Sequence, residues 1–229
     1  MSKVFISGSI NIKSLDEKVK SRLNNVIASG LDVLIGDAGG VDKSVQQYFK
    51  QHNFAEVTVY CTGSVPRNND GQWPVVNVEP PVKTKSRAYF TAKDLKMADD
   101  SDFGLMIWDC KSPGTLSNVI ELLKKKKKSV VYVSSEKSFF NITNTSDLKK
   151  LVMLMDEDAL LEANKKVSLD KKLASLDENY PVSRENEKQI IYDKIKEHRD
   201  IIAKHELEIL SLQEKLDKTL EPTDDMFTS

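Results

Sequence analysis

Small residues gather at three places in this sequence where a short apolar run ends. The first group spans residues 7–9 (Ser-Gly-Ser), the second residues 36–40 (Gly-Asp-Ala-Gly-Gly) and the third residues 112–115 (Ser-Pro-Gly-Thr). Glycine lets the backbone approach an anion closely, and serine or threonine adds a hydroxyl donor. Each group stands before a predicted helix, where free backbone N–H groups and the helix dipole favour negative charge. The chemistry predicted from these groups is phosphate binding.

The elements that must position these groups are predicted to alternate along the chain as strand, loop and helix. Short apolar runs near residues 3–7, 33–35, 57–60, 103–108 and 130–133 read as buried strands, with apolar positions at helical spacing between them. Residues 61–84 contain four prolines and read as a long loop or irregular insertion. We expect an α/β fold, a Rossmann-like open parallel sheet of about five strands with flanking helices, followed by a C-terminal helical or coiled-coil tail.

In an open parallel sheet the carboxyl ends of the strands form the ligand edge, and all three groups fall there. Any one group by itself reads equally well as a tight turn, and neither a G-x-x-x-x-G-K-[ST] loop nor a G-x-G-x-x-G fingerprint occurs. Together the groups predict a site for a phosphorylated, nucleotide-type ligand. The candidate ligand-binding residues are Ser7, Gly8, Ser9, Gly36, Ala38, Gly39, Gly40, Asp42, Arg87, Asp109, Ser112, Gly114, Thr115 and Asn118.

These motifs resemble the SLOG superfamily of Rossmann-like domains over about residues 3–135. The segment Gly36-Asp37-Ala38-Gly39-Gly40-Val41-Asp42 is similar to the G-x-A-x-G-x-D element of its Smf/DprA and YspA-like branches. The segment Ser112-Pro113-Gly114-Thr115 is similar to the P-G-G-x-G-T loop of the lysine-decarboxylase-like phosphoribohydrolases. The resemblance implies binding of nucleotides or nucleotide-derived small molecules, with hydrolysis of an N-glycosidic bond in some members and sensing in others.

The hydrolase pattern is not complete in this chain. The resemblance would place two glutamates shortly after Gly114-Thr115, whereas Ser117 and Asn118 stand there. An amide cannot act as a carboxylate base or stabilise an oxocarbenium ion. Asp109 is the candidate catalytic residue that would substitute, and a contact with a ribose hydroxyl or a hydrogen bond that orders its loop are the alternatives for it. Whether the chain is an enzyme, a nucleoside phosphate N-glycosidase or a deoxyribosyltransferase-like one, stays open.

Several other side chains have both a functional and a structural interpretation. Arg87 with Tyr89 would clamp a phosphate and stack a base, or would be solvated on a helix surface. Trp73 is expected to anchor its loop on the core. Lys124 to Lys128 end a helix, where lysines complement the dipole, and we interpret them as a solvated helix end rather than a nucleic-acid site.

Composition predicts partners and compartment. The formal net charge of the whole chain is −1, which argues against nucleic acid as a partner. Two distant cysteines and three histidines predict neither a disulfide framework nor a metal site, and no cofactor is expected. No apolar stretch suits a signal peptide or a membrane span, so a cytoplasmic protein with no membrane partner is expected.

The chain divides where glycine stops, since none of its nine glycines follows Gly114. We expect a nucleotide-ligand domain at 1–140, a helical extension and linker at 141–184, and one long helix at 185–220. Apolar and histidine residues from Ile191 to Leu216 alternate in steps of four and three, a heptad pattern of nearly four repeats. Homo-oligomerisation through 185–220 is therefore expected, although Lys194 and Arg199 would repel each other in a parallel pair.

The sequence thus predicts a ligand-binding or sensor protein for a nucleotide-derived small molecule, oligomerised by its tail. An N-glycosidic-bond hydrolase or transferase and a purely structural interaction protein are the two alternatives.

Overall fold

The computed structural model describes the backbone of residues 1–82, 84, 86–179 and 184–220, and their side chains except for 177–179, 184–194 and 217–220. The chain forms two compact units, Met1–Pro181 and Val182–Ser229. No helix among these residues has the length and apolar character needed to cross a membrane. Residues 180–183, in the predicted linker, lie outside the described part.

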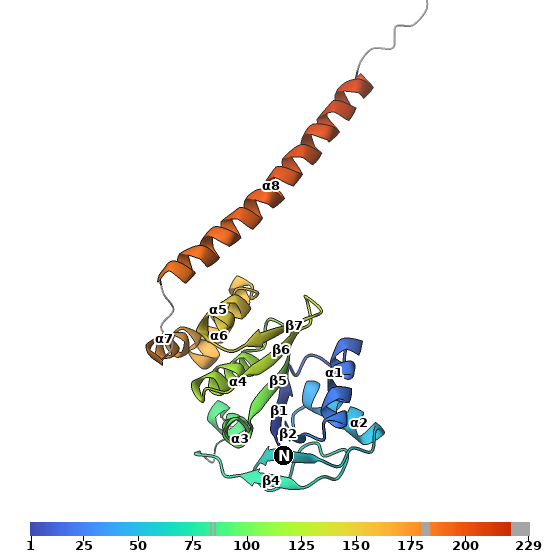
Figure 1. Cartoon of the computed structure of the whole chain (residues 1–229), viewed down its shortest axis with the longest axis vertical. Coiled ribbons are helices and arrows are strands. Elements are labelled where there is room, and N and C mark those ends of the chain that lie inside the picture. Colours follow the sequence, from blue (N-terminus) through green and yellow to red (C-terminus); the bar gives the residue numbers. More distant parts are fainter. Residues whose placement is uncertain (83, 85, 180–183, 221–229) are drawn as a thin grey trace, which may run out of the picture. The chain divides into compact units, whose positions relative to one another are not determined.

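The first unit is built on one seven-stranded sheet (Figure 1). Its strands are β1 (Lys3–Gly8), β2 (Asp32–Gly36), β3 (Val57–Thr62), β4 (Val75–Val78), β5 (Phe103–Trp108), β6 (Ser129–Val133) and β7 (Ser138–Ile142), in the order β4-β3-β2-β1-β5-β6-β7. All neighbours pair in parallel except β6 and β7. The predicted Rossmann-like α/β class is confirmed, with two edge strands more than the five expected.

Helices cover both faces of this sheet. Along β1, Phe5 packs into one core and Ile6 into the other, because successive side chains of a strand point to opposite faces. The Ile6 core receives α1 (Glu17–Ala28) and α2 (Val41–Gln51); the Phe5 core receives α3 (Arg87–Asp100) and α4 (Pro113–Lys124). Burial on both faces explains why these strands read as continuous apolar runs.

Three shorter helices extend the Phe5 core. They are α5 (Thr145–Val152), α6 (Glu157–Val167) and α7 (Leu169–Asn179). They lie in the range 141–184, which the sequence predicted as a helical extension and linker. Leu169 and Leu176 of α7 are buried, since two leucines seven residues apart lie on one helix face and suffice to bury a short, otherwise polar helix.

The second unit is described by its one long helix, α8 (Arg184–Leu220), as the tail pattern predicted. Figure 1 shows it as a single continuous helix.

The direction of chain progression reverses at β1. From β1 the chain steps outward through β2 and β3 to β4, then returns to the other side of β1 with β5 and continues outward to β7. The carboxyl ends of β1 and β5, which pair up to Gly8 and Ile107, therefore flank the topological switch point where open α/β sheets bind ligands.

Candidate functional site

Asp109, directly after β5, fastens the two loops at the switch point. Its carboxylate accepts hydrogen bonds from the Ser9 hydroxyl, from Asn11 Nδ2 (3.3 Å) and from the backbone N–H groups of Lys111 (3.1 Å) and Ser112 (2.7 Å). Burial by itself would raise the pKa of Asp109, but these hydrogen bonds, led by that of Ser9, hold it below its ordinary value. The loop-ordering alternative for Asp109 is therefore seen directly, and a catalytic role stays a prediction.

A second pair ties α4 to β1 beneath that loop. Asn118 donates from Nδ2 to the Ser7 hydroxyl over 3.0 Å, and both side chains are buried. Nearby on α4, the buried Thr115 hydroxyl has no hydrogen-bond partner among the described residues. Asn118 thus holds the helix start against the sheet.

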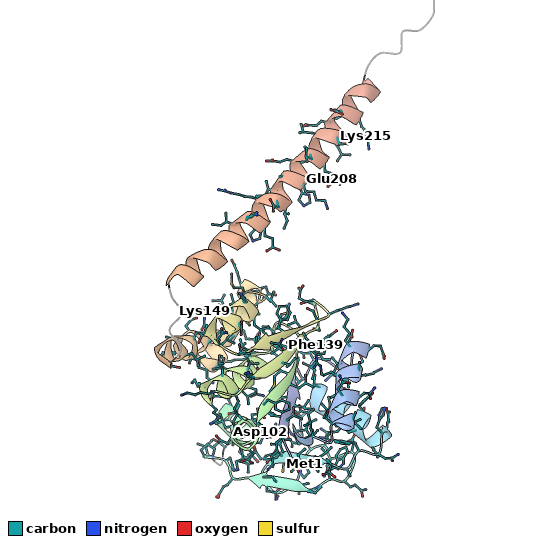
Figure 2. The ribbon with its side chains drawn as sticks, viewed as in Figure 1. Met1, Asp102, Phe139, Lys149, Glu208 and Lys215 are labelled. Atoms are coloured by element: carbon teal, nitrogen blue, oxygen red, sulfur yellow. The ribbon has the colours of Figure 1, made fainter. Side chains whose placement is uncertain are left out.

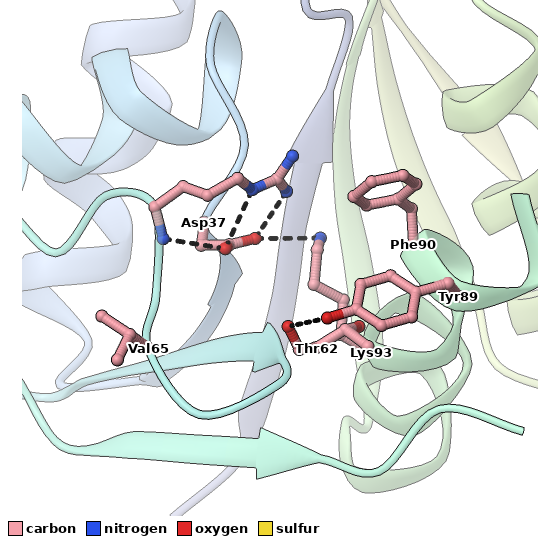
Figure 3. A pocket seen from close by; sticks show the side chains of 7 residues that line it. Asp37, Thr62, Val65, Tyr89, Phe90 and Lys93 are labelled. Atoms are coloured by element: carbon pink, nitrogen blue, oxygen red, sulfur yellow. Dashed lines mark hydrogen bonds and ion pairs between the residues drawn. The ribbon is translucent and has the colours of Figure 1, made fainter. Parts of the chain in front are cut away.

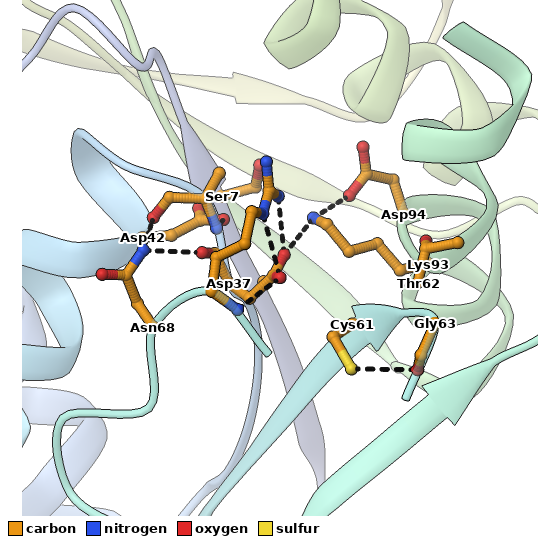
Figure 4. A network of polar contacts seen from close by, with 12 residues as sticks. Ser7, Asp37, Asp42, Cys61, Thr62, Gly63, Asn68, Lys93 and Asp94 are labelled. Carbon is orange, nitrogen blue, oxygen red and sulfur yellow. Dashed lines mark hydrogen bonds and ion pairs between the residues drawn. The ribbon is translucent and has the colours of Figure 1, made fainter. Parts of the chain in front are cut away.

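A buried charge cluster fills the end of β2 (Figure 4). Arg67 donates to both oxygens of Asp37, from Nη2 over 2.7 Å and from Nε over 3.0 Å. Lys93 Nζ lies 2.7 Å from Asp94 and 4.0 Å from Asp37, and only 5% of Lys93 is exposed. These contacts among four residues link α3 to the loops that follow β2 and β3.

The carboxylates of this cluster titrate differently. Burial tends to raise the pKa of Asp37, but the Arg67 guanidinium and backbone N–H outweigh it and lower that pKa. Asp42 is bonded only to the backbone N–H of Ala38 (3.1 Å), so burial raises its pKa to about 6 in spite of the nearby Lys93. Burial opposes the charge on Lys93 as well, yet Asp94 and Asp42 raise its pKa and keep it an ammonium.

The same residues form one wall of a cavity of about 170 Å³ (Figure 3). Tyr89 and Phe90 of α3 stand opposite Asp37, and Thr62 and Val65 lie below them. The Arg67 guanidinium lies over the Phe90 ring, 5.6 Å from its centroid. A space of this size is well below the ~300–1,000 Å³ typical of sites that enclose a small-molecule ligand.

Two helices begin at this edge without a side-chain cap. Neither α2, with Gly40 at its N-cap, nor α4, with Ser112 there, has a side-chain hydrogen bond to its first turn. By contrast, α1, α3, α5 and α6 are capped by Asp16, Ser86, Asn144 and Asp156 respectively. A β-carbon on Gly39 or Gly114 would meet no atom within 4 Å. The Val41 N–H at the start of α2 donates to the Ser9 carbonyl (3.2 Å), and Pro113 at the start of α4 has no N–H, so the open space at these helix starts lies at Gly39 and Gly114.

The predicted site residues fall into three groups. Ser7 joins Asn118, Ser9 joins Asp109 and Ser112, and Gly36, Ala38 and Asp42 join the charge cluster. Gly8 and Gly40 pack closely against Ile107 and Ile10, while Gly39, Gly114 and Thr115 line the helix starts. Arg87 begins α3 and is exposed; no hydrogen bond or ion pair of its guanidinium occurs in the described part of the chain.

The sequence did not identify the centre of the charge cluster. Lys93 is not among the candidate residues, yet it follows Tyr89 and precedes Met97 by four residues each, a spacing that places it on the buried face of α3. The interpretation of Trp73 as a loop anchor is confirmed, since Trp73 is buried and donates to the Phe54 carbonyl (3.0 Å). Lys127, interpreted as part of a solvated helix end, instead donates to the carbonyl oxygens of Ala98 and Asp99 at the end of α3.

Comparison with known proteins gives little beyond this geometry. No family model and no curated protein matches the chain. Among solved structures, the chain is similar to DNA processing protein A from Helicobacter pylori, a structure described as showing a unique single-stranded DNA binding mode. The two are 20% identical with a TM-score of 0.44, and the match covers 57% of this chain and 64% of that one, less than two thirds of its length.

Two predictions made from the sequence are corrected at this point. The sequence indicated a sensor for a nucleotide-derived small molecule and argued against nucleic acid as a partner. The similar structure is that of a single-stranded DNA-binding protein, and none of the predicted ligand-binding residues lines the cavity of about 170 Å³. Neither prediction is kept.

Proposed function

We propose that the α/β unit binds single-stranded nucleic acid, and that its phosphates lie at the uncapped starts of α2 and α4. The observation that carries this proposal is the pair of open helix N-termini at one sheet edge, with Gly39 and Gly114 clear of any neighbouring atom. Each start offers the positive end of a helix dipole, and the open space at Gly39 and Gly114 lets a phosphate approach the backbone there. Gly39, Gly40, Gly114 and Thr115 are the proposed phosphate contacts.

The distribution of charge supports a polyanion. Residues 1–143 hold 20 basic and 15 acidic side chains, a net charge of +5, while the remainder holds 14 basic and 20 acidic, a net charge of −6. The whole-chain value of −1 conceals this division. Lys13, Lys43 and Arg87 are exposed on loops or helix starts at the carboxyl edge, while Arg67 is paired with Asp37 and Lys111 with Asp156.

A single strand fits this edge better than a duplex does. Phe90 is 39% exposed at the mouth of the cavity, beside the Arg67 guanidinium. Unpaired bases stack on aromatic faces while basic residues follow the backbone, and each stacked base contributes ~1–3 kcal/mol. Bases inside a duplex are already stacked and cannot use Phe90.

The same proposal includes two further statements. The chain is a member of the SLOG superfamily, and it is located in the cytoplasm, with nucleic acid as its ligand. The resemblance to the Smf/DprA branch rests on residues 36–42, which the structure places between β2 and α2, at one of the two open helix starts.

The test is binding of a fluorescently labelled 20-nucleotide DNA, followed by anisotropy at low salt, with the duplex of the same sequence alongside. Gly39→Asp and Gly114→Asp each place a carboxylate where a phosphate would lie, without a steric clash. Asn25→Asp is the matched control, because it adds the same charge on an exposed residue near the opposite end of α1.

We expect wild type and the control to bind the single strand more tightly than the duplex, with a dissociation constant of ~10⁻⁶–10⁻⁴ M that weakens as salt rises. Each glycine variant should bind about five- to tenfold more weakly, since the lost contact and the added repulsion together are worth ~1–1.4 kcal/mol. Absence of binding by wild type, or glycine variants that match the control, would overturn the proposal.

A further inference from the structure

The long helix α8 presents a row of apolar side chains to solvent. Ile195, Ile202, Ile209 and Leu212 are 43%, 55%, 54% and 59% exposed. Side chains leave the helix in every direction along its described length, with Glu208 and Lys215 among them (Figure 2). Most helical stability in proteins comes from packing an apolar face, and a lone helix of polar and apolar stripes is marginal in water. The exposed row therefore requires an occupant.

The spacing of the row identifies the occupant as another helix with the same repeat. Ile195, Ile202 and Ile209 stand at one core position of a heptad, and His198, His205 and Leu212 stand at the other. In a parallel pair of two such helices, His198 would face His198 of the second copy, and His205 would do the same. Two layers of facing imidazoles would leave polar groups in the seam without apolar contacts.

An antiparallel pair removes that conflict. When residue i faces residue 407 − i of the second copy, Ile195 faces Leu212, Ile202 faces His205 and Ile209 faces His198. Each imidazole then packs against an isoleucine instead of another imidazole. His205 also keeps its neighbour on the same helix, with Nδ1 lying 3.8 Å from Glu208.

The charges near the centre of the seam fit this register, which places Arg199 beside Glu206 of the second copy, twice by symmetry. A shift of one heptad in one direction sets Arg199 against Arg199, and a shift in the other direction sets Glu206 against Glu206. Opposite charges at such positions favour a register, and like charges oppose it. The charges do not by themselves select this register, because the one-heptad shift that sets Arg199 against Arg199 also sets Lys194 beside Glu208 twice, by heptad position alone. In the same way, Lys215 meets Lys194 of the second copy in the chosen register, a like-charge pair far from the centre.

The length of the helix is compatible with this register and nearly as compatible with the register in which residue i faces 400 − i. α8 runs from Arg184 to Leu220, 37 residues. With residue i facing 407 − i, residue 187 faces residue 220, so all but three helical residues overlap. The overlap is about 50 Å long at 1.5 Å per residue. The register that matches seam and charges is also nearly the one that aligns the helix ends.

We propose that a second copy of this chain covers the exposed row of α8, as an antiparallel two-helix coiled coil centred between Ile202 and His205. This assembly is independent of the nucleic-acid site. Leu207 and Leu210 lie off the seam and stay on the outside of the pair.

The first experiment measures the mass of the full-length protein in solution by light scattering and sedimentation, without nucleic acid. The expected mass is twice 25.8 kDa. Arg199→Glu should weaken the dimer at least fivefold, and Arg199→Glu with Glu206→Arg should restore it, because the pair is rebuilt with its signs exchanged. Lys204→Glu, the same charge change off the seam, should have no effect. In a parallel dimer Arg199→Glu would strengthen association, because position 199 would face Lys194.

Cysteine pairing gives the orientation directly. Ile195→Cys and Leu212→Cys proteins, one of them carrying a size tag, are mixed and oxidised; the native Cys61 and Cys110 are buried. We expect the mixed 195–212 disulfide and neither symmetric one. Symmetric disulfides alone, a monomeric wild type or a mass above two chains would each overturn the proposal. Because DNA is absent, failure here leaves the nucleic-acid proposal untouched, and failure of DNA binding leaves this one untouched.

Discussion

Burial and the neighbouring charged groups set the protonation states of Asp42 and Lys93. Asp42 has a single backbone hydrogen bond and 4% exposure, so its ionised form gains little that offsets desolvation. Lys93 lies among Asp37, Asp42 and Asp94, which keep it charged. The result is a fixed cation beside Gly36, at the end of β2.

The raised pKa of Asp42 predicts a pH-dependent stability. In the unfolded chain this carboxyl has a pKa near 3.8, against about 6 in the fold. The stabilising contribution of the protonated form is therefore complete below the unfolded value and is lost as the pH rises through about 6. The asparagine of Asp42→Asn is neutral at every pH. Between pH 4 and pH 8 the unfolding free energy of wild type should therefore fall by about 1–3 kcal/mol relative to that of Asp42→Asn.

Urea unfolding of both proteins across that range measures the difference. A constant difference at all pH values would show that Asp42 has the same pKa in both states and would contradict its burial as the cause.

Substitution by alanine should change the stability of the protein in opposite directions at Gly8, the last residue of β1, and at Gly114 of α4. A β-carbon on Gly8 would lie 2.4 Å from the Ile107 carbonyl oxygen and 2.6 Å from Val41 Cγ2, so Gly8→Ala should destabilise the protein by about 1–3 kcal/mol. Gly114 is in the first turn of α4 with open space around it, so Gly114→Ala should stabilise by about 0.5–1 kcal/mol. Thermal unfolding checks both; equal shifts of the two variants would refute the packing difference.

At the scale of elements, most of the fold was predictable because buried parallel strands and amphipathic helices leave strong patterns. β1, β2, β3, β5 and β6 and the helices between them follow from apolar runs and helical spacing. β4 and β7 did not, since both are edge strands whose side chains are largely half-exposed, which removes the apolar run that marks a central strand. Lys93 was missed for a related reason. The buried face of a helix is found from apolar residues at helical spacing, and a lysine on that face does not fit this pattern.

The packing of α7 against the core predicts that its buried leucine contributes to the stability of the protein. Leu176 is fully buried against the core that α4, α5 and α6 share. Leu176→Ala should cost about 2–5 kcal/mol of unfolding free energy through lost contacts and the cavity left behind. Leu161 on α6 is 68% exposed, so Leu161→Ala is the matched control and should change stability by less than about 0.5 kcal/mol. Similar losses in both variants would mean that α7 is not docked on the core.

At the scale of the whole molecule, the separation of charge explains why the overall count misled the sequence-based reading. A chain with a net charge of −1 has no global attraction to a polyanion, but the unit Met1–Pro181 holds 26 basic and 23 acidic side chains, a net charge of +3, and the unit Val182–Ser229 holds 8 and 12, a net charge of −4. The small-residue loops were predictable from sequence, whereas the uncapped state of their helices was not, because capping depends on where each side chain points.

The most direct measurement follows the backbone amides themselves. Heteronuclear NMR of the ¹⁵N-labelled protein, titrated with an unlabelled 20-nucleotide single strand, reports each N–H separately. Donation to phosphate should shift the amide signals of Gly39, Gly40, Gly114 and Thr115 well before those of Lys124 to Lys128 at the far end of α4. If saturating DNA leaves these four signals in place while others move, the nucleic-acid site is not at the open helix starts and the account is wrong.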